Sequence, residues 1–490
     1  MTLFRNTKLK PEIAVPLYQQ IYDHLRIAIV EGQLRQGAKL PSTRALADEL
    51  GVSRNTILNA YDQLAAEGYL ERLEGKGTFV TQSLPEAFFT PGRSVSPVER
   101  AGRAHQLSER ATALLSAPSM PIPHYPPARG QISFPVGIPA LDAFPFELWA
   151  RLVSRHARGL HPSALDYPDL AGYRPLREAI ADHVIVARQV HCSPEQVIIV
   201  TGSQGALHLA ARVLLNPGDS VWVEDPGYPN ARNGLLAAGA RLVAVPVDQE
   251  GIVVEAGVAR APEARMAYLT PSHQFPLGMT LSLKRRLAIL DWAKRANAYI
   301  LEDDYDGEYR FDGRPLAALQ GLDDHDSVIY IGTFSKVLFP ALRIGYLIVP
   351  QALVDTFLAT RRAIDARLPR LEQAVLAEFI AEEHFTRHIR RMRTLYAERR
   401  AALLEAARDL PLELYAPHTG LHLIGWLPPG VDDRAAAACA ADQQVDVLPV
   451  SMLALEPMPR GALALGYGAV KQHEIQEGVR RLSAALRNVH

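Results

Sequence analysis

The sequence contains few of the features that mark secreted or membrane-embedded proteins. Only two of its 490 residues are cysteines, Cys192 and Cys439, so a disulfide framework is excluded and a reducing compartment is favoured. No apolar run approaches the roughly 18 residues that a membrane-spanning helix needs. The first residues lack the apolar core and cleavage site of a signal peptide. We therefore expect a cytoplasmic protein with no membrane partner.

A general excess of positive charge is also missing, because the formal net charge is −1 at pH 7. This balance does not exclude nucleic acid as a ligand, since binding requires local rather than global positive charge. A hydrophobic content of 48% and a charged content of 21% are ordinary for a globular protein. The length is sufficient for two or three domains of roughly 100–200 residues each.

The first 80 residues predict three helices followed by a β-hairpin. Pro16 can begin a helix in which apolar residues recur every four positions. Ser42 and Ser53 can N-cap a second and a third helix, and Gly51 separates the two. Two short β-type runs flank a glycine-rich turn at residues 74–77.

This pattern is typical of a winged helix-turn-helix that binds double-stranded DNA. Such a motif places the N-terminal residues of its second helix at base edges in the major groove, here Ser53, Arg54, Asn55 and Thr56. Arginine and asparagine match the edges of guanine and adenine. Arg44 is placed to contact phosphate, and Lys76 in the turn to contact the minor groove or the backbone. The alternative is a three-helix module for protein contact with solvated arginines. Residues 40–80 closely resemble the winged-helix head of GntR-type regulators, which favours DNA.

The hydrophobic periodicity fades between residues 81 and 130, where eight prolines occur. This stretch is longer than a loop inside a compact domain, so we interpret it as an inter-domain linker. It has at most one short helix, around residues 97–115.

From about residue 131, short β-rich runs alternate with helical segments. The expected strands are residues 197–201, 220–224, 241–246, 266–269, 299–302, 328–332 and 344–348. The expected helices are residues 175–188, 205–215, 283–298 and 371–380. Such alternation predicts a mainly parallel sheet that is covered on both faces. A long helix at residues 385–410 and strand-like pieces after it predict a small α+β cap.

Residues in this second region predict a site for an aldehyde cofactor, pyridoxal phosphate. The amine of Lys336 can hold such a cofactor as a Schiff base. Asp303, which follows an expected strand, can keep the ring nitrogen protonated, and the Tyr305 hydroxyl can bond to the ring oxygen. Tyr228 can stack on the ring. Each residue alone is a weak signal, and their order and spacing carry the prediction.

A phosphate cradle is expected close by. Residues 201–205 follow a strand and begin a helix, which is the usual arrangement of an anion site. The side chains that can complete the cradle are Thr333, Ser335 and Arg343.

Together, these motifs carry a specific resemblance to known families. Residues 130–480 resemble the fold-type I aminotransferases, and the whole chain outside the linker is identified as a member of the MocR family. In that family a GntR-type head is fused to an aminotransferase-like body. The segments that carry the resemblance are residues 225–229, 270–276, 302–306 and 332–346.

The resemblance implies a multi-domain protein with three parts. These are a GntR-type DNA-binding domain at residues 1–80, a linker at 81–130, and an α/β fold-type I domain with its α+β cap at 131–490. It also implies that Lys336 binds pyridoxal 5′-phosphate and that Asp303 pairs with the ring nitrogen. The other cofactor contacts that it implies are Ser203, Gln204, Tyr228, His273, Gln274 and Tyr305.

The chain departs from the family pattern at one position. In relatives that bind an amino acid, an arginine near the C-terminus grips the carboxylate, and Ala464 stands at that place here. Alanine cannot form a bidentate clamp. Arg460 lies four residues earlier and can either substitute for the clamp or occupy a turn. We favour the turn, which puts transamination of an ordinary α-amino acid in doubt.

The combination predicts a DNA-binding transcriptional regulator whose body senses pyridoxal phosphate or an amino-group ligand through Lys336. Genes of vitamin B6 or amino-compound metabolism are candidate targets. Fold-type I bodies are normally dimers, so Tyr167 is expected to reach the partner's cofactor, and paired DNA half-sites follow from the two-fold symmetry. One alternative is a working aminotransferase with an accessory DNA-binding head. Another is a body that serves only for dimerisation and binds no cofactor.

Overall fold

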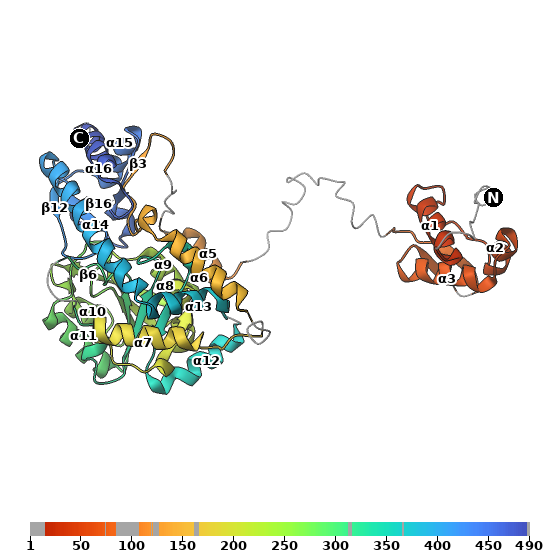
Figure 1. Cartoon of the computed structure of the whole chain (residues 1–490), viewed down its shortest axis with the longest axis horizontal. Coiled ribbons are helices and arrows are strands. Elements are labelled where there is room, and N and C mark those ends of the chain that lie inside the picture. Colours follow the sequence, from red (N-terminus) through yellow and green to blue (C-terminus); the bar gives the residue numbers. More distant parts are fainter. Residues whose placement is uncertain are drawn as a thin grey trace. The chain divides into compact units, whose positions relative to one another are not determined.

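The computed structural model describes residues 15–487 except 74, 85–106, 119, 121–126, 161–165, 312–315 and 365–366. The chain forms two compact units, Met1–Gln106 and Leu107–His490 (Figure 1). Within the described residues, no helix is long and apolar enough to cross a membrane.

The small unit has the expected three helices and hairpin, which are α1 (Leu17–Val30), α2 (Thr43–Leu50), α3 (Arg54–Ala66), β1 (Leu70–Leu73) and β2 (Gly77–Val80). Both predicted caps are confirmed. The Ser42 side chain accepts a hydrogen bond from the backbone N–H of Ala45, and Ser53 accepts one from Thr56. Gly51 ends α2 in the left-handed conformation, at φ 65°. Short-range rules of helix capping therefore set the helix-turn-helix geometry.

A core of its own stabilises this unit. Ile21 and Leu25 of α1 pack with Ile57 and Leu64 of α3, and all four are 1% exposed or less. These positions follow the helical period of the sequence. The unit therefore has the means to fold as a separate domain.

The large unit is built on an eight-stranded sheet with the order β4-β11-β10-β9-β8-β5-β6-β7. Its strands are β4 (Val197–Val200), β5 (Ser220–Asp225), β6 (Arg241–Asp248), β7 (Gly251–Ile252), β8 (Met266–Leu269), β9 (Tyr299–Asp304), β10 (Val328–Thr333) and β11 (Gly345–Ile348). Neighbouring strands are parallel except where β11 and β7 pair. The predicted mainly parallel sheet is confirmed.

Side chains of each strand alternate between the two faces of the sheet. In β4, Ile198 and Val200 face an apolar cluster that includes residues of α8, α9 and α12. Val197 and Ile199 face another cluster, which includes residues of α7 and α13. The helices concerned are α7 (Arg174–Arg188), α8 (Gly202–Leu214), α9 (Pro229–Ala237), α12 (Val354–Ala363) and α13 (Arg370–Ala381). Helices therefore cover both faces of the sheet (Figure 1).

The C-terminal part forms the predicted α+β cap. A four-stranded antiparallel sheet has the order β12 (Glu413–Tyr415), β13 (His422–Trp426), β16 (Ala462–Gly466) and β15 (Leu448–Pro449). The helices around it are α14 (His384–Ala406), α15 (Asp433–Asp442) and α16 (Gln472–Leu486). Strand β3 (Ile132–Ser133) pairs in parallel with β14 (Val445–Asp446) in a separate two-stranded sheet.

Several helices were not predicted, and the bounds of others differ from those expected. Helix α8 begins three residues earlier, at Gly202. The helices that the sequence did not predict are α6 (Phe146–Arg158), α9, α10 (Val254–Arg260), α12, α15 and α16. Helices as short as α9 and α10 complete too few turns for a clear hydrophobic period. Helix α11 (Leu283–Ala296) ends two residues before its predicted end.

One short helix, α5 (Glu109–Ser116), lies within the stretch interpreted as a linker. It belongs to the large unit and packs against α9. Part of the helix expected at residues 97–115 falls on residues 97–106, outside the described part of the chain.

Candidate cofactor site and DNA-binding surface

The predicted cofactor residues meet at the carboxyl edge of the parallel sheet. β9 and β10 pair in parallel with Ile331 opposite Asp303, so the ends of both strands lie side by side. Asp303 is at the end of β9, and Lys336 follows the end of β10 by three residues. Ligands of open α/β sheets commonly bind at this edge.

One carboxylate oxygen of Asp303 accepts a hydrogen bond, and the other has no hydrogen-bond partner among the described residues. The hydroxyl of Tyr268, on β8, donates to Asp303 Oδ2 at 2.8 Å. Asp303 Oδ1 is buried and has no hydrogen-bond partner among the described residues. Burial raises the pKa of the carboxyl to about 7, and the charge of Lys336 opposes that shift. A buried acceptor without a donor is costly, and a protonated ring nitrogen would satisfy it.

Lys336 lies near this carboxylate with its amine pointing into the protein. Its Nζ donates to the carbonyl oxygen of Gly137 at 2.8 Å. Burial lowers the pKa of the Lys336 ammonium, and Asp306 and Asp303 act in the opposite direction. Gly137 has a φ of 72°, and a Cβ there would lie 3.1 Å from Nζ. A lysine with a lowered pKa is a better nucleophile toward an aldehyde.

Tyr305 is positioned by a buried pair, His273 and Asp306. His273 Nδ1 lies 2.8 Å from Asp306 Oδ2 and 3.0 Å from the Tyr305 hydroxyl. The His273 ring packs so closely on Gly420 that a Cβ there would come within 2.0 Å of it. The predicted role of His273 as a cofactor contact stays a prediction, and its described hydrogen bonds are with Tyr305 and Asp306.

Gln274 bonds to backbone groups of its own loop and of the loop after β5. It donates to the carbonyl oxygens of Pro226 and Phe275 and accepts from the N–H of Leu277. All these partners are backbone groups, so Gln274 stabilises the loop after β8.

The expected phosphate cradle is at the N-terminus of α8. Ser203 and Gln204 lie in its first turn, where free N–H groups attract an anion. Arg343 has a left-handed φ of 53°, and its Nη2 donates to Thr201 O at 3.5 Å. β11 begins close by, because a Cβ on Gly345 would be 2.9 Å from the backbone of Gly202. Thr333 ends β10, and its hydroxyl accepts from the N–H of Ser335 at 3.2 Å.

An apolar cluster lies against the two predicted ring-contact residues. Tyr228 and Tyr305 pack on a buried set made of Val136, Phe275, Leu277, Met279, Ile424, Val450, Leu453, Ala462 and Ala464. Tyr228 meets Phe275 edge to face, with ring centroids 5.5 Å apart. The fully buried Ala464 belongs to this apolar set.

Arg460 is directed away from this cluster. Its Nε donates to the carbonyl oxygen of Leu427, and its Nη1 pairs with the carboxylate of Glu413 on β12. Both partners bind the guanidinium at the outer part of the cap sheet. The structure therefore supports the turn interpretation of Arg460.

The residues present fit pyridoxal phosphate. A buried amine, a buried carboxylate oxygen without a donor and a helix N-terminus correspond to its aldehyde, ring nitrogen and phosphate. When bound, this cofactor supplies an electron sink.

Sequence reasoning missed several residues that support the site. Arg188 donates to Asp304 at 2.6 Å and to Ser272 at 2.6 Å, which ties the end of β9 to the loop after β8. Tyr268 was placed only within a strand, although it positions Asp303. Asp306 carried a visible signal, because it ends the acidic run that begins at Glu302.

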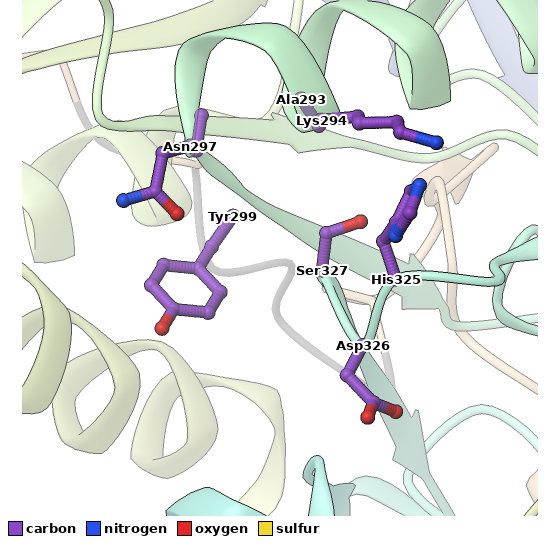
Figure 2. Close-up of a pocket in the computed structure, with 8 residues that line it drawn as sticks. Ala293, Lys294, Asn297, Tyr299, His325, Asp326 and Ser327 are labelled. Atoms are coloured by element: carbon purple, nitrogen blue, oxygen red, sulfur yellow. The ribbon is translucent and has the colours of Figure 1, made fainter.

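A separate cavity of about 220 Å³ lies at the other end of β9. Tyr299, at the start of that strand, lines it together with Ser327, just before β10, and Asn297, after α11 (Figure 2). The opposite end of β9 carries Asp303. This cavity is therefore distinct from the predicted cofactor site.

The small unit displays most of its predicted DNA contacts on the surface. Arg54 and Asn55 are exposed in the first turn of α3, and Thr56 is half-buried. Arg54 Nε donates to Thr43 Oγ1 at 3.4 Å, which orients the guanidinium. Ser53 is exposed as well, although its side chain is engaged as the N-cap.

Two more cations predicted to contact DNA are exposed in the small unit. Arg44 is exposed in α2, and Lys76 is exposed in the hairpin turn. Sequence reasoning missed Lys39, whose ammonium lies 5.8 Å from the ring centroid of Phe79 in the hairpin.

Comparison with known proteins matches both units. The model of the family "Aminotransferase class I and II" matches residues 129–482, and that of "Bacterial regulatory proteins, gntR family" matches residues 17–80. The probable rhizopine catabolism regulatory protein MocR of Rhizobium meliloti is 41% identical, over 96% of this chain and 94% of its own. The HTH-type pyridoxine biosynthesis transcriptional regulator PdxR of Corynebacterium glutamicum is 33% identical, over 85% and 84%.

A solved structure agrees with this assignment. The α-aminoadipate aminotransferase LysN of Thermus thermophilus, complexed with N-(5′-phosphopyridoxyl)-L-leucine, is 29% identical with a TM-score of 0.67. The match covers 78% of this chain and 95% of LysN. The family match and this neighbour indicate pyridoxal 5′-phosphate as the cofactor of the large unit, and the GntR-type unit implies DNA binding. The chain belongs to the aminotransferase class I and II family and, with its GntR-type head, to the MocR family of helix-turn-helix transcriptional regulators.

Proposed function

We propose that this regulator binds pyridoxal phosphate through Lys336 and changes its action on DNA when the cofactor or an amine effector occupies the site. The observation that carries the proposal is the unsatisfied Oδ1 of Asp303, buried at the strand edge where Lys336 also lies. A buried carboxylate oxygen without a donor costs stability, so it is best explained by a ligand that supplies one. The protonated ring nitrogen of pyridoxal phosphate would do so.

Each remaining residue has a role in this proposal. The amine of Lys336 holds the aldehyde carbon, because burial lowers its pKa and favours the neutral, nucleophilic form. Tyr228 stacks on the ring, and Tyr305 donates toward the ring oxygen while His273 fixes its hydroxyl. The first turn of α8, with Ser203 and Gln204, holds the phosphate together with Thr333, Ser335 and Arg343.

A sensor is favoured over a working aminotransferase. The apolar surroundings of Ala464 and the pairing of Arg460 with Glu413 supply no clamp for a substrate carboxylate. Relatives that match over nearly their full length are named as regulators of rhizopine catabolism and of pyridoxine biosynthesis. We propose that the effector is the cofactor itself or an amino compound, and that the target genes serve vitamin B6 or amino-compound metabolism.

Dimerisation and the DNA target belong to the same proposal. Tyr167 is 83% exposed, as expected for a side chain that a partner would cover. In a two-fold homodimer it would reach the partner's cofactor, and the two heads would bind paired half-sites of one operator. The protein would act in the cytoplasm.

Absorbance and DNA binding of the Lys336→Ala variant test the proposal. Pyridoxal phosphate should give wild type a visible absorbance band that the variant lacks, because alanine cannot bind the aldehyde. Operator affinity, measured by mobility shift, should respond to the cofactor only in wild type. Lys294→Ala, in the exposed end of α11, is the matched control and should behave as wild type.

Other outcomes would select other functions. A wild-type protein without any band would favour a body that serves only for dimerisation. A band that leaves DNA affinity unchanged and turns over an amino acid would favour the enzyme.

A further inference from the structure

Two asparagines of helix α9 bind backbone groups of Pro118 and Met120, which lie within the segment predicted as the linker. The N–H of Met120 donates to Asn230 Oδ1 at 3.2 Å, and Asn233 Nδ2 donates to the carbonyl oxygen of Pro118 at 2.9 Å. Positions 230 and 233 are three residues apart, so they share one face of the helix. Helix α5 packs against the same helix. The segment that leads toward the DNA-binding unit is therefore fastened to α9 at two backbone points.

Asn230 also contacts the predicted ring-stacking residue. Its Nδ2 lies 3.4 Å from the hydroxyl of Tyr228, to which it donates. The single amide thus bonds to the linker through its oxygen and to Tyr228 through its nitrogen. Asn233 has no described bond to the cofactor site, so the two asparagines differ in this one respect.

The side chain of Met120 makes a second link to the same place. It packs on the apolar cluster that also receives Tyr228 and Tyr305. Met120 therefore approaches the surroundings of the cofactor ring as well as the amide of Asn230.

A simple capping role does not explain Asn230. The N-cap of α9 is Tyr228, which makes no side-chain cap, and the oxygen of Asn230 accepts from the linker rather than from the helix's own backbone. Asparagines near helix starts usually bond to their own first turn. The use of this amide for a residue 110 positions away points to a role between segments.

We propose that Asn230 is a positioning residue that couples docking of the linker to occupancy of the cofactor site, which rests on the proposed function above. While Met120 occupies Oδ1, the amide is held with Nδ2 toward Tyr228, and the tyrosine is held for stacking. When the linker leaves, the amide is free to rotate and Tyr228 loses the hydrogen bond from Asn230. Docking and cofactor binding therefore favour one another, and linkage requires the effect to be equal in both directions.

Hydrogen exchange of the full-length protein reads the docked state directly. Among residues 118–121 only two carry an amide N–H, because both ends are prolines. Adding pyridoxal phosphate should slow exchange in the peptide that contains Met120. In Asn230→Ala the exchange should be fast and should not respond to the cofactor.

A double-mutant cycle tests the route. Asn233→Ala removes the other anchor without touching Tyr228, and it should weaken cofactor binding by about two- to tenfold, the range that one lost hydrogen bond gives. In the Asn230→Ala background the same substitution should leave the cofactor Kd unchanged. Kd is measured by absorbance titration of each full-length variant.

Three results would overturn the coupling. The first is faster exchange of the Met120 amide in Asn233→Ala with a Kd that stays at the wild-type value. The second is an equal weakening of cofactor binding by Asn233→Ala in both backgrounds, which would remove Asn230 from the route. If wild type binds no pyridoxal phosphate, the proposed function and the coupling both fail, whereas normal wild-type binding with either of the first two results removes the coupling alone.

Discussion

At the scale of single residues, the cofactor site contains ionisable side chains whose burial costs free energy, and a ligand can reduce that cost. Asp303 and Lys336 are both removed from water, which raises the pKa of the first and lowers that of the second. Each shift disfavours the charged form. Asp303 also keeps one unsatisfied oxygen. The protein without cofactor therefore carries a cost at these side chains, and binding removes part of it.

Asp303→Asn should stabilise the cofactor-free protein at neutral and higher pH while it weakens cofactor binding. Between about pH 4 and pH 7, the unfolded chain has lost the proton that folded Asp303 retains, so the stability of wild type falls as pH rises through this window. Asparagine does not titrate and still accepts from Tyr268. We expect a gain of about 1–2 kcal/mol at pH 8 and none at pH 3.5, measured by denaturant unfolding.

Asp291→Asn, on the exposed side of α11, is the control and should leave the pH profile as in wild type. An Asp303→Asn protein that is no more stable than wild type at pH 8 would contradict the burial cost assigned to Asp303.

Arg54 is the residue whose loss should most directly reduce operator recognition. Arg54→Ala should weaken specific binding by about 1–3 kcal/mol, because a guanidinium can bind both acceptors of one guanine. Arg54→Lys keeps the charge without the bidentate geometry, so it should retain non-specific binding but lose discrimination. Titration with operator DNA and with scrambled DNA measures specific and non-specific binding. An unchanged operator affinity in Arg54→Ala would contradict base recognition by Arg54.

At the scale of elements, helix beginnings carry several of the residues proposed to bind ligands. The first turn of α8 carries Ser203 and Gln204 of the proposed phosphate cradle, that of α3 presents Arg54 and Asn55, and that of α9 carries Asn230. A helix N-terminus combines free N–H groups with a defined side-chain direction. The site and the DNA surface thus use the same structural device for different ligands.

The start of α3 offers a test at this scale. Ser53→Ala should destabilise the small unit by about 0.5–2 kcal/mol, because the N–H of Thr56 loses its acceptor. Ser53→Asp should restore stability, since a carboxylate caps and also suits the helix dipole. The negative charge should nevertheless weaken DNA binding by repelling phosphate. If thermal unfolding of Ser53→Ala matches that of wild type, the cap contributes nothing.

At the scale of the whole molecule, the chain consists of two units with separate cores. The apolar cluster of the small unit contains residues only between positions 21 and 84, whereas the other clusters belong to the large unit. The segment with α5 and Met120 belongs to the large unit although it continues the linker. The chain therefore enters the large unit through this segment.

Calorimetry of the intact protein should show two unfolding transitions. Pyridoxal phosphate should raise the transition of the large unit alone, because a ligand stabilises only the part whose folded form binds it. At a concentration of 100 times Kd the stabilisation is about 2.7 kcal/mol. Lys336→Ala should show no such rise, and an equal shift of both transitions would contradict the division into independent units.

Local patterns in the sequence predicted a large part of this structure. The caps at Ser42 and Ser53 and the alternating runs of the sheet were predicted because capping and periodicity act over a few residues. The shared edge of Asp303 and Lys336 follows from the parallel strands that end at these positions. Those features are determined by the sequence read in short windows.

Tertiary structure alone decided the partners of side chains that meet over long separations. The pairing of Arg460 with Glu413, the contact of Tyr268 with Asp303 and the bond of Asn230 to Met120 join positions 47, 35 and 110 residues apart. No local period indicates which partner such a side chain meets. The partner depends on how its helix or strand packs against elements that are distant in sequence. Sequence thus determined which groups are available and where elements begin, whereas packing determined which of those groups meet.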